Sequence, residues 1–166
     1  MGGSDRSRAL PLAARCRRDL FGRLLSFFGS DRSKYDSAAA VQQDSGVAPL
    51  TEQSGKMRFV HRRYACNKFS RQSFIEWAGQ TVGKSTWAKA FHLHQKAKGH
   101  RHHSILRSLA YKWQRILFRS WQDSRIYDKA RYIEALKAAS SPLVPIINQL
   151  LKPAGENCEK PGKITF

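Results

Sequence analysis

The stretch RSLAYKWQRILFRSWQ, residues 107–122, decides the fold because it places a basic stripe beside an apolar one. Apolar side chains recur at spacings of three and four from residue 105 onward, which puts them on one packing face of an α-helix. That face comprises Ile105, Leu109, Trp113, Ile116, Leu117 and Trp121. A separate stripe comprises Ser108, Lys112, Arg115 and Arg119, with no acidic residue among them. Because exposed helices usually mix both signs of charge, the basic stripe predicts contact with an anion.

Composition extends this prediction to the whole chain. The 166 residues contain 30 Lys and Arg against 12 Asp and Glu, a formal net charge of +18. Residues 58–132 contain 17 of the basic residues and only three acidic ones, so the segment that supplies the core also supplies the charge. With 41% hydrophobic residues, the chain can bury one modest core. Nucleic acid is the leading class of partner and an anionic membrane surface the second.

Several classes of protein are disfavoured by missing motifs. The three cysteines form no CxxC pair, which indicates free thiols in a reducing cytosol. Phosphate-loop, dinucleotide-binding and HExxH zinc motifs are absent. The basic segment RALPLAARCRRDLFGRLLSFFG, residues 8–29, has charges throughout its apolar run, so it predicts neither a signal peptide nor a membrane span. We therefore expect a cytoplasmic protein without a membrane partner.

A cluster of histidines, HLHQKAKGHRHH at residues 92–103, raises the question of a metal site. His92 and His94 are two residues apart and point to different sides of a helix. No Cys or acidic residue lies near enough in sequence to complete a tetrahedral shell. We therefore predict no metal ion in this chain, and interpret the cluster as basic surface that is solvated or faces nucleic acid.

The pattern predicts a mainly α-helical fold: a small helical domain with one short hairpin or extended element near Ser54 and disordered termini. The Ser-Gly pair at residues 54 and 55, followed by the alternating MRFVHRRYA, indicates the hairpin. Asp36 is the expected N-cap of a short helix that ends at Gly46. Helices are expected at residues 19–28, 38–43, 69–79, 86–98, 102–122 and 127–138.

Four ordered segments resemble one known family. They are LLSFFGSDRSKYDSAAAVQQDSGVAPLTEQSGK, VHRRYACNKFSRQSFIEWA, WAKAFHLHQKAKGHRHHSILRSLAYKWQRILFRSWQ and YDKARYIEALKAASSPL. In this order they are similar to the C-terminal transposase domain of the insertion-sequence 110 family (116/110/902 type), the bridge-RNA-guided DNA recombinases. The resemblance covers residues 20–143. It leaves residues 1–19 as an unmatched basic tail and residues 144–166 as a tail expected to be disordered.

The resemblance implies a two-part enzyme of DNA transposition. A RuvC-like domain would bind divalent metal, expected to be Mg²⁺, through acidic residues, and the C-terminal domain would supply a serine nucleophile that attacks a DNA phosphodiester. Ser54 in QSG stands at the position of that serine. Cations near such a serine would neutralise charge on the phosphate; those nearby are Lys56, Arg58, His61, Arg62 and Arg63. Otherwise Ser54 is only a turn residue, and the next candidates are Ser45, Ser70 and Ser73.

The RuvC-like domain and its acidic residues are not found in the chain, and the residues PLAARCRR precede LLSFFGSD in place of the family's usual hairpin. We therefore expect a truncated transposase that holds no cofactor itself and neither cleaves nor joins DNA alone. Its expected partners are DNA, a guide RNA and further copies or other transposase subunits, at the bacterial nucleoid. Two alternatives stay open: a non-catalytic nucleic-acid-binding fragment, as a relic or an inhibitor, and an unrelated cationic RNA-binding protein.

Aromatic side chains near the basic stripe divide into two groups. Tyr111 lies beside the stripe and is the candidate for stacking on an unpaired base. The tryptophans recur at helical spacing and are expected to pack in the core instead; they are Trp77, Trp87, Trp113 and Trp121. The residues of the long helix expected to bind nucleic acid are Arg107, Tyr111, Lys112, Arg115 and Arg119.

Overall fold

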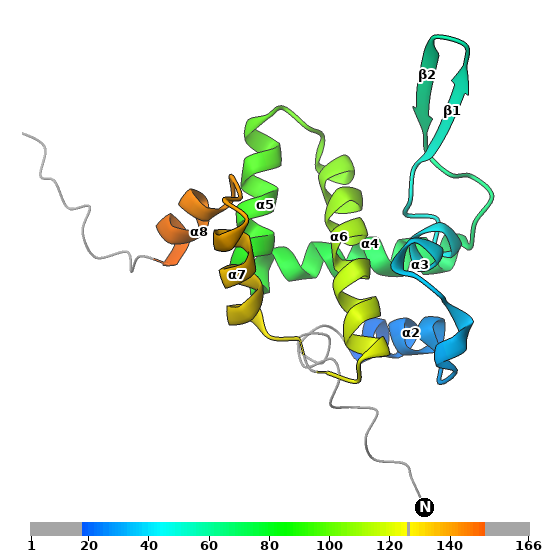
Figure 1. Ribbon diagram of the computed structural model, residues 1–166, viewed down its shortest axis with the longest axis horizontal. Coiled ribbons are helices and arrows are strands. Elements are labelled where there is room, and N and C mark those ends of the chain that lie inside the picture. Colours follow the sequence, from blue (N-terminus) through cyan, green and yellow to red (C-terminus); the bar gives the residue numbers. More distant parts are fainter. Residues whose placement is uncertain (1–17, 126, 152–166) are drawn as a thin grey trace, which may run out of the picture.

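A computed structural model describes residues 18–125 and 127–151 of the chain (Figure 1). Its helices are α2 (Arg18–Phe28), the short 3₁₀ helix η1 (Arg32–Lys34), α3 (Ala38–Asp44), α4 (Lys68–Lys84), α5 (Thr86–Ala97), α6 (His102–Gln122), α7 (Lys129–Ala138) and α8 (Val144–Leu151). Between α3 and α4, the strands β1 (Leu50–Ser54) and β2 (Met57–His61) pair antiparallel. The predicted mainly α-helical fold with a hairpin at Ser54 is confirmed.

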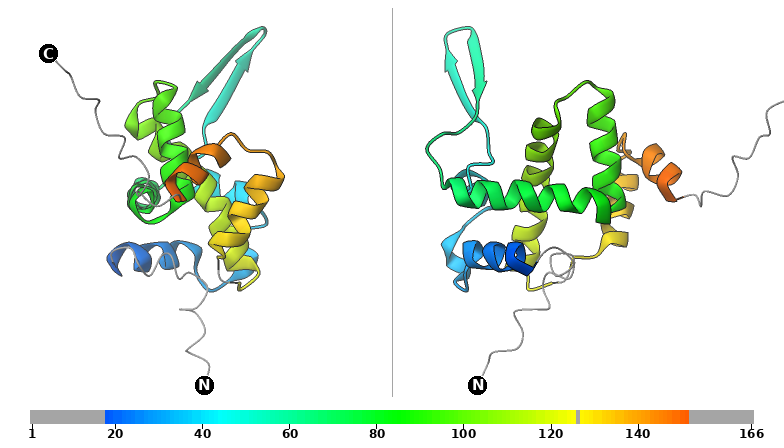
Figure 2. Two further views of the ribbon diagram at one scale, coloured as in Figure 1. Left: turned by 90° about the vertical axis from the view of Figure 1, so that its left-hand side faces the viewer. Right: turned by 180° about the vertical axis from the view of Figure 1, so that it is seen from behind.

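Helix α6 is the central element of the helical body. It runs antiparallel to α5, and α4 packs across both of them (Figure 1). α3 packs on α6, α2 packs along α4, and α8 covers α5. Figure 2 shows that the β1–β2 hairpin projects away from this body. Every residue of both strands is exposed, so the hairpin has no packed face.

Trp113 lies at the centre of the core. The centre of its ring lies 4.9 Å from that of Trp77 on α4 and 4.7 Å from that of Trp87 on α5. Its indole N–H donates to Thr81 Oγ1 at 2.9 Å, which satisfies the polar end of the ring. These contacts join three helices at one point. The prediction that the tryptophans pack in the core is confirmed, since Trp121 is buried as well.

A buried polar chain holds α3 against α6. Gln114 Nε2 donates to Ser45 Oγ at 2.6 Å, and Ser45 Oγ donates to the carbonyl of Gln42 at 3.2 Å. Gln42 Nε2 in turn donates to the carbonyl of Tyr111 at 2.9 Å. Because buried polar groups without partners are costly, these bonds fix the position of α3 and of the loop that leads into β1.

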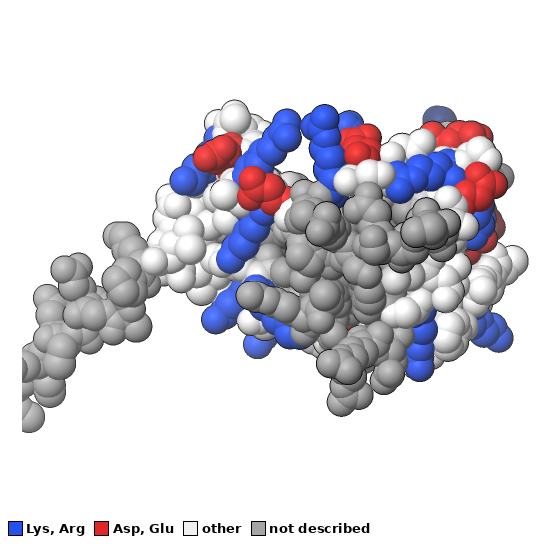
Figure 3. Space-filling model, turned by 90° about the horizontal axis from the view of Figure 1, so that it is seen from below, with Lys and Arg blue, Asp and Glu red and all other residues white. Residues whose placement is uncertain are grey.

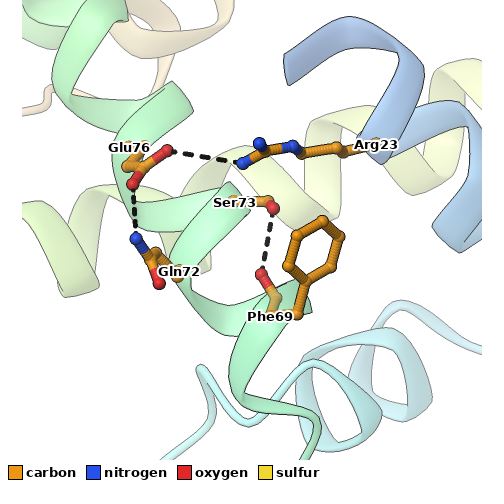
Figure 4. A network of polar contacts seen from close by, with 5 residues as sticks. All are labelled: Arg23, Phe69, Gln72, Ser73 and Glu76. Carbon is orange, nitrogen blue, oxygen red and sulfur yellow. Dashed lines mark hydrogen bonds and ion pairs between the residues drawn. The ribbon is translucent and has the colours of Figure 1, made fainter. Parts of the chain in front are cut away.

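Helix α2 is attached to α4 by surface contacts (Figure 4). The guanidinium of Arg23 lies 4.0 Å from the carboxylate of Glu76 and 4.9 Å from the ring centre of Phe69. Gln72 Nε2 donates to Glu76 Oε1 at 2.7 Å, and Ser73 Oγ donates to the carbonyl of Phe69 at 2.9 Å. Exposed ion pairs contribute only about 0–1 kcal/mol. The apolar face of α2, which belongs to the core, therefore provides most of the attachment.

The two chain segments at the foot of the β-hairpin are pressed together. Gly46 precedes β1 and has a φ of +69°. Cys66, which follows β2, lies so close that a Cβ at position 46 would be 2.2 Å from its Sγ. Arg71 on α4 donates to the carbonyl of Arg63 at 3.0 Å and contacts Cys66 Sγ at 3.2 Å. Position 46 therefore requires glycine both for its backbone conformation and for its close contact.

Most predicted helix boundaries are confirmed within two residues, and the exceptions have local causes. The N-cap of α3 is Ser37 rather than Asp36: Ser37 Oγ accepts a hydrogen bond from Ala40 N at 3.2 Å. Helix α4 continues well past its predicted end at Gly79. This glycine lies against a leucine side chain of α6, and Thr81, further along the same helix, bonds the central tryptophan.

The expectation of a disordered tail from residue 144 onward is wrong for residues 144–151. They form α8, which packs against α5 and buries Ile147. The Gly and Lys residues that suggested disorder lie beyond this helix, whereas VPIINQLL is largely apolar and can cover a neighbour. The rest of the two expected tails, residues 1–17 and 152–166, lies outside the described residues.

The substitution Gly46→Ala is expected to lower the free energy of unfolding by about 2–4 kcal/mol, because it combines a positive φ with a methyl group forced against Cys66. Gly29→Ala is the matched control. Gly29 also has a positive φ, +72°, but a Cβ there meets open space, so the loss should be about 1–2 kcal/mol. Chemical denaturation of both variants measures the difference. Equal losses would show that the contact with Cys66 does not restrict position 46.

Candidate nucleic-acid interface

A groove with a volume of about 840 Å³ lies where the foot of the β-hairpin meets α5 and α6. One face of α6 forms its longest wall, because side chains three and four residues apart point the same way. That wall consists of Ser104, Arg107, Ser108, Tyr111, Lys112 and Arg115. The other walls come from α5, from both segments of the hairpin foot and from the loop before α8; they are Phe91, His94, Gln95, Lys98 and residues 46–49, 60–63 and 141–143.

The charge of the groove is of one sign. Lys or Arg side chains enter it from the hairpin foot, from α5 and from α6, and none of its walls, as far as the chain is described, carries an acidic residue. Lys112 Nζ lies 5.2 Å from the ring centre of Phe91, so this lysine links α6 to α5. The face that points away from the hairpin tip differs, since acidic side chains lie among its basic ones (Figure 3). The groove is therefore suited to an extended anionic ligand.

Two arginines at the hairpin end of the groove have unpaired Nε donors, and a third, Arg62, lies 5.9 Å from the ring centre of Tyr64. The Nε atoms of Arg63 and Arg107 are buried and donate to no group within residues 18–125 and 127–151. Burial lowers the pKa of Arg107, and the neighbouring charges of Arg62 and Arg71 lower it further. The folded chain thus holds like charges together, an arrangement that a bound anion would relieve.

Ser54 lies apart from the groove, at the tip of the β-hairpin. It pairs with Met57 across a two-residue turn whose first residue, Gly55, has a φ of +56°. Its side chain is exposed and makes no hydrogen bond to any residue that the structure describes. The hydroxyl is therefore accessible, but no base in the described part of this chain activates it. The three alternative serines are buried: Ser45, Ser70 and Ser73.

The structure brings most of the predicted nucleic-acid-binding residues together. Those that line the groove are His61, Arg62, Arg63, Arg107, Tyr111, Lys112 and Arg115. Lys56 lies instead in the exposed turn beside Ser54, and Arg58 lies on β2. Arg119 is exposed on the last turn of α6 and does not line the groove, because α6 extends past the end of this site.

Sequence reasoning did not single out His94 of α5 or Lys98, the residue that follows α5, as groove residues. Their spacing from Phe91 places all three on one face of a continued helix, and projecting that helix would have found them. His92 points elsewhere, as predicted: its Nε2 lies 3.1 Å from Nδ1 of His102. Within the described ranges, no three His, Cys, Asp or Glu side chains lie close enough to hold a metal ion. No described helix is both long and apolar enough to span a bilayer.

Comparison with known proteins finds one family. The family model described as "Transposase IS116/IS110/IS902 family" matches residues 18–93, which include the β-hairpin, α4 and most of α5. Over these residues, a little under half of its length, the chain is similar to this transposase family. A curated relative, named as the mini-circle transposase for IS117 of Streptomyces coelicolor, is 29% identical over 122 residues. The match covers 74% of this chain but only 30% of the relative, so the chain spans about a third of that protein. No solved structure matches the chain significantly.

The family match covers the two parts of the interface unequally. Ser54 and the hairpin foot lie inside the matched segment, residues 18–93. The wall contributed by α6 begins at Ser104 and lies beyond it. The α6 wall is therefore supported by its geometry and charge, whereas Ser54 is supported by the similarity to the family.

Proposed function

We propose that this chain takes part in DNA transposition, as the portion of a transposase that binds nucleic acid and supplies the attacking serine. The family match over residues 18–93 carries the proposal, because it includes the exposed hairpin that presents Ser54. The chain spans 30% of a relative that is itself named as a transposase. Further subunits, including one with the acidic residues of a RuvC-like domain, would complete the enzyme at the bacterial nucleoid.

The groove supports the nucleic-acid-binding part of this function. Its basic walls can neutralise several backbone phosphates of DNA or of a guide RNA. Tyr111 is 36% exposed and lies between Arg107 and Arg115 on the α6 wall, so its ring can stack on an unpaired base while the arginines hold the backbone. The combination favours a strand with accessible bases over a smooth duplex.

The β-hairpin supports a catalytic role for Ser54. Attack by Ser54 Oγ on phosphorus would form a phosphoserine ester with one DNA end and release the oxygen of the other end. Lys56 lies in the turn beside Ser54 and is exposed, so it can stabilise charge that develops on the phosphate, whereas Arg58 lies on the opposite face of the hairpin. The hydroxyl proton needs an acceptor, and the described residues offer none at hydrogen-bonding distance. A group outside the described residues would supply the base, and we assign no step to a metal at the described residues because they form no site for one.

A non-catalytic role in binding nucleic acid is the second candidate. No described residue offers a base beside Ser54, which favours this role for the chain acting alone, where it would occupy DNA or guide RNA without exchanging strands. The two candidates share the groove and differ only in the use of Ser54.

Removal of two groove charges tests nucleic-acid binding in the groove, which both candidate functions share. The double variant Lys112→Gln/Arg115→Gln should bind single-stranded DNA roughly 10- to 100-fold more weakly at about 0.1 M salt, and the magnitude of the slope of log affinity against log salt should fall by about 1.4. Arg131→Gln/Lys137→Gln is the matched control, because both residues are exposed on α7 and neither lines the groove. Fluorescence anisotropy over a salt series measures both quantities. Equal effects of the two double variants would remove the groove from the interface.

Substitution of Ser54 tests the catalytic part, with partner subunits and guide RNA supplied. Ser54→Ala removes one exposed oxygen, so stability should change by no more than about 0.5 kcal/mol and nucleic-acid affinity should be retained. Covalent protein–DNA adducts and recombinant product should be lost. Thr51→Ala, which removes a hydroxyl from the other face of β1, should retain both. Product formation by Ser54→Ala at the rate of the unmodified chain would show that Ser54 is only a turn residue.

A further inference from the structure

The hairpin end of the groove contains buried hydrogen-bond donors that nothing in the described chain satisfies. Arg62 and Arg63 directly follow β2, and Arg107 lies in the second turn of α6. The Nε atoms of Arg63 and Arg107 are both buried and unpaired among the described residues. Native structures rarely leave such donors without an acceptor, which a water, an ion or a ligand supplies where the protein does not.

The charges around these donors also favour an anionic ligand. Arg71 is buried, and its guanidinium is already used to hold the carbonyl of Arg63 and the sulfur of Cys66. It therefore adds a fixed positive charge beside Arg107 without serving as an acceptor. The ion pairs within the described ranges are Arg23 with Glu76 and His61 with Glu52, so no carboxylate pairs with this cluster.

We propose that Arg62, Arg63 and Arg107 form a binding site for one backbone phosphodiester, and that its occupation ties the foot of the β-hairpin to α6. The proposal rests on the proposed function and adds to it a defined subsite with a mechanical consequence. Guanidinium groups suit this ligand, since their forked donors match the oxygens of a phosphate in pairs.

A nucleic-acid backbone fits the site better than a free phosphate ion, because further side chains that can bind a strand follow the arginines along α6. The α6 wall leads from Arg107 past Tyr111 to Lys112 and Arg115, so a strand that starts at the arginines meets an aromatic ring and two more cations along one helix face. A free ion would use only the three arginines.

The mechanical consequence follows from where the three residues are attached. Two of them belong to the hairpin foot and one belongs to the helical body, so an anion held by all three is a bridge. Without it, the described hairpin is held by the contact of Gly46 with Cys66 and by the bond from Arg71, since its strands are fully exposed. The bridge would therefore restrict the direction in which Ser54 is presented.

The test compares Arg107→Gln with Arg115→Gln in the full chain, since each removes one groove charge but only Arg107 belongs to the cluster. In free protein, Arg107→Gln should raise Tm by about 2–4 °C because a repulsion is removed, whereas Arg115→Gln should leave Tm unchanged. Each variant should bind a single-stranded oligonucleotide about tenfold more weakly at about 0.1 M salt. Hydrogen exchange should show that the oligonucleotide protects the amides of residues 62–67 in Arg115→Gln but not in Arg107→Gln.

The outcomes separate this proposal from the proposed function. A fall in Tm together with unchanged affinity in Arg107→Gln would show a structural arginine, and retained protection of residues 62–67 would exclude the bridge; in both cases the groove could still bind DNA. Unchanged affinity in both variants would instead contradict binding in the groove. Inorganic phosphate is the second probe: full protection of the foot by phosphate alone would assign the site to the free ion. Arg62→Gln, whose side chain is exposed, repeats the test without risk to folding.

Discussion

The packing of Trp113 between Trp77 and Trp87 is the constraint on which the rest of the structure depends. Trp77 meets the ring of Trp113 edge to face and Trp87 meets it at a tilt, which joins α4, α5 and α6 at one point and restricts the rotation of α6. The rotation of α6 decides which side chains face the groove, because Tyr111 and Lys112 are the two residues that precede the buried tryptophan in sequence. The packing of the core and the geometry of the binding wall are therefore set by the same contact.

Stability and binding make opposite demands on this chain. The ion pairs in the described ranges are exposed ones, so attraction between charges does little to offset the repulsion within the groove. The aromatic core and the buried chain from Gln114 to Gln42 must hold the fold against it. A cluster of like charges lowers the stability of the free protein. Such a cluster is expected where a ligand of opposite charge binds.

Local patterns in the sequence were enough to predict much of this structure. The period of α6 separates its buried and basic faces, the four tryptophans follow from their helical spacing, and the Ser-Gly pair locates the hairpin. What could not be predicted depends on contacts between distant segments. Nothing in the spacing of Arg63 and Arg107 indicates that they line one groove, and Arg119 shares the stripe of Lys112 but falls beyond the groove. Helix α8 was missed because its stability comes from packing on α5 rather than from its own composition.

The register of the β-hairpin restricts the number of its residues more strictly than their identity. Side chains alternate between the faces of a strand, and the register that pairs Ser54 with Met57 puts the serine on the same face as Phe59 and opposite to Arg58. A shift of one residue would move every side chain of the shifted strand to the other face. Substitutions along these strands leave the direction of the serine unchanged, whereas one codon gained or lost between Leu50 and Ser54 would reverse it. The hairpin should therefore drift in composition over evolutionary time far more freely than in length.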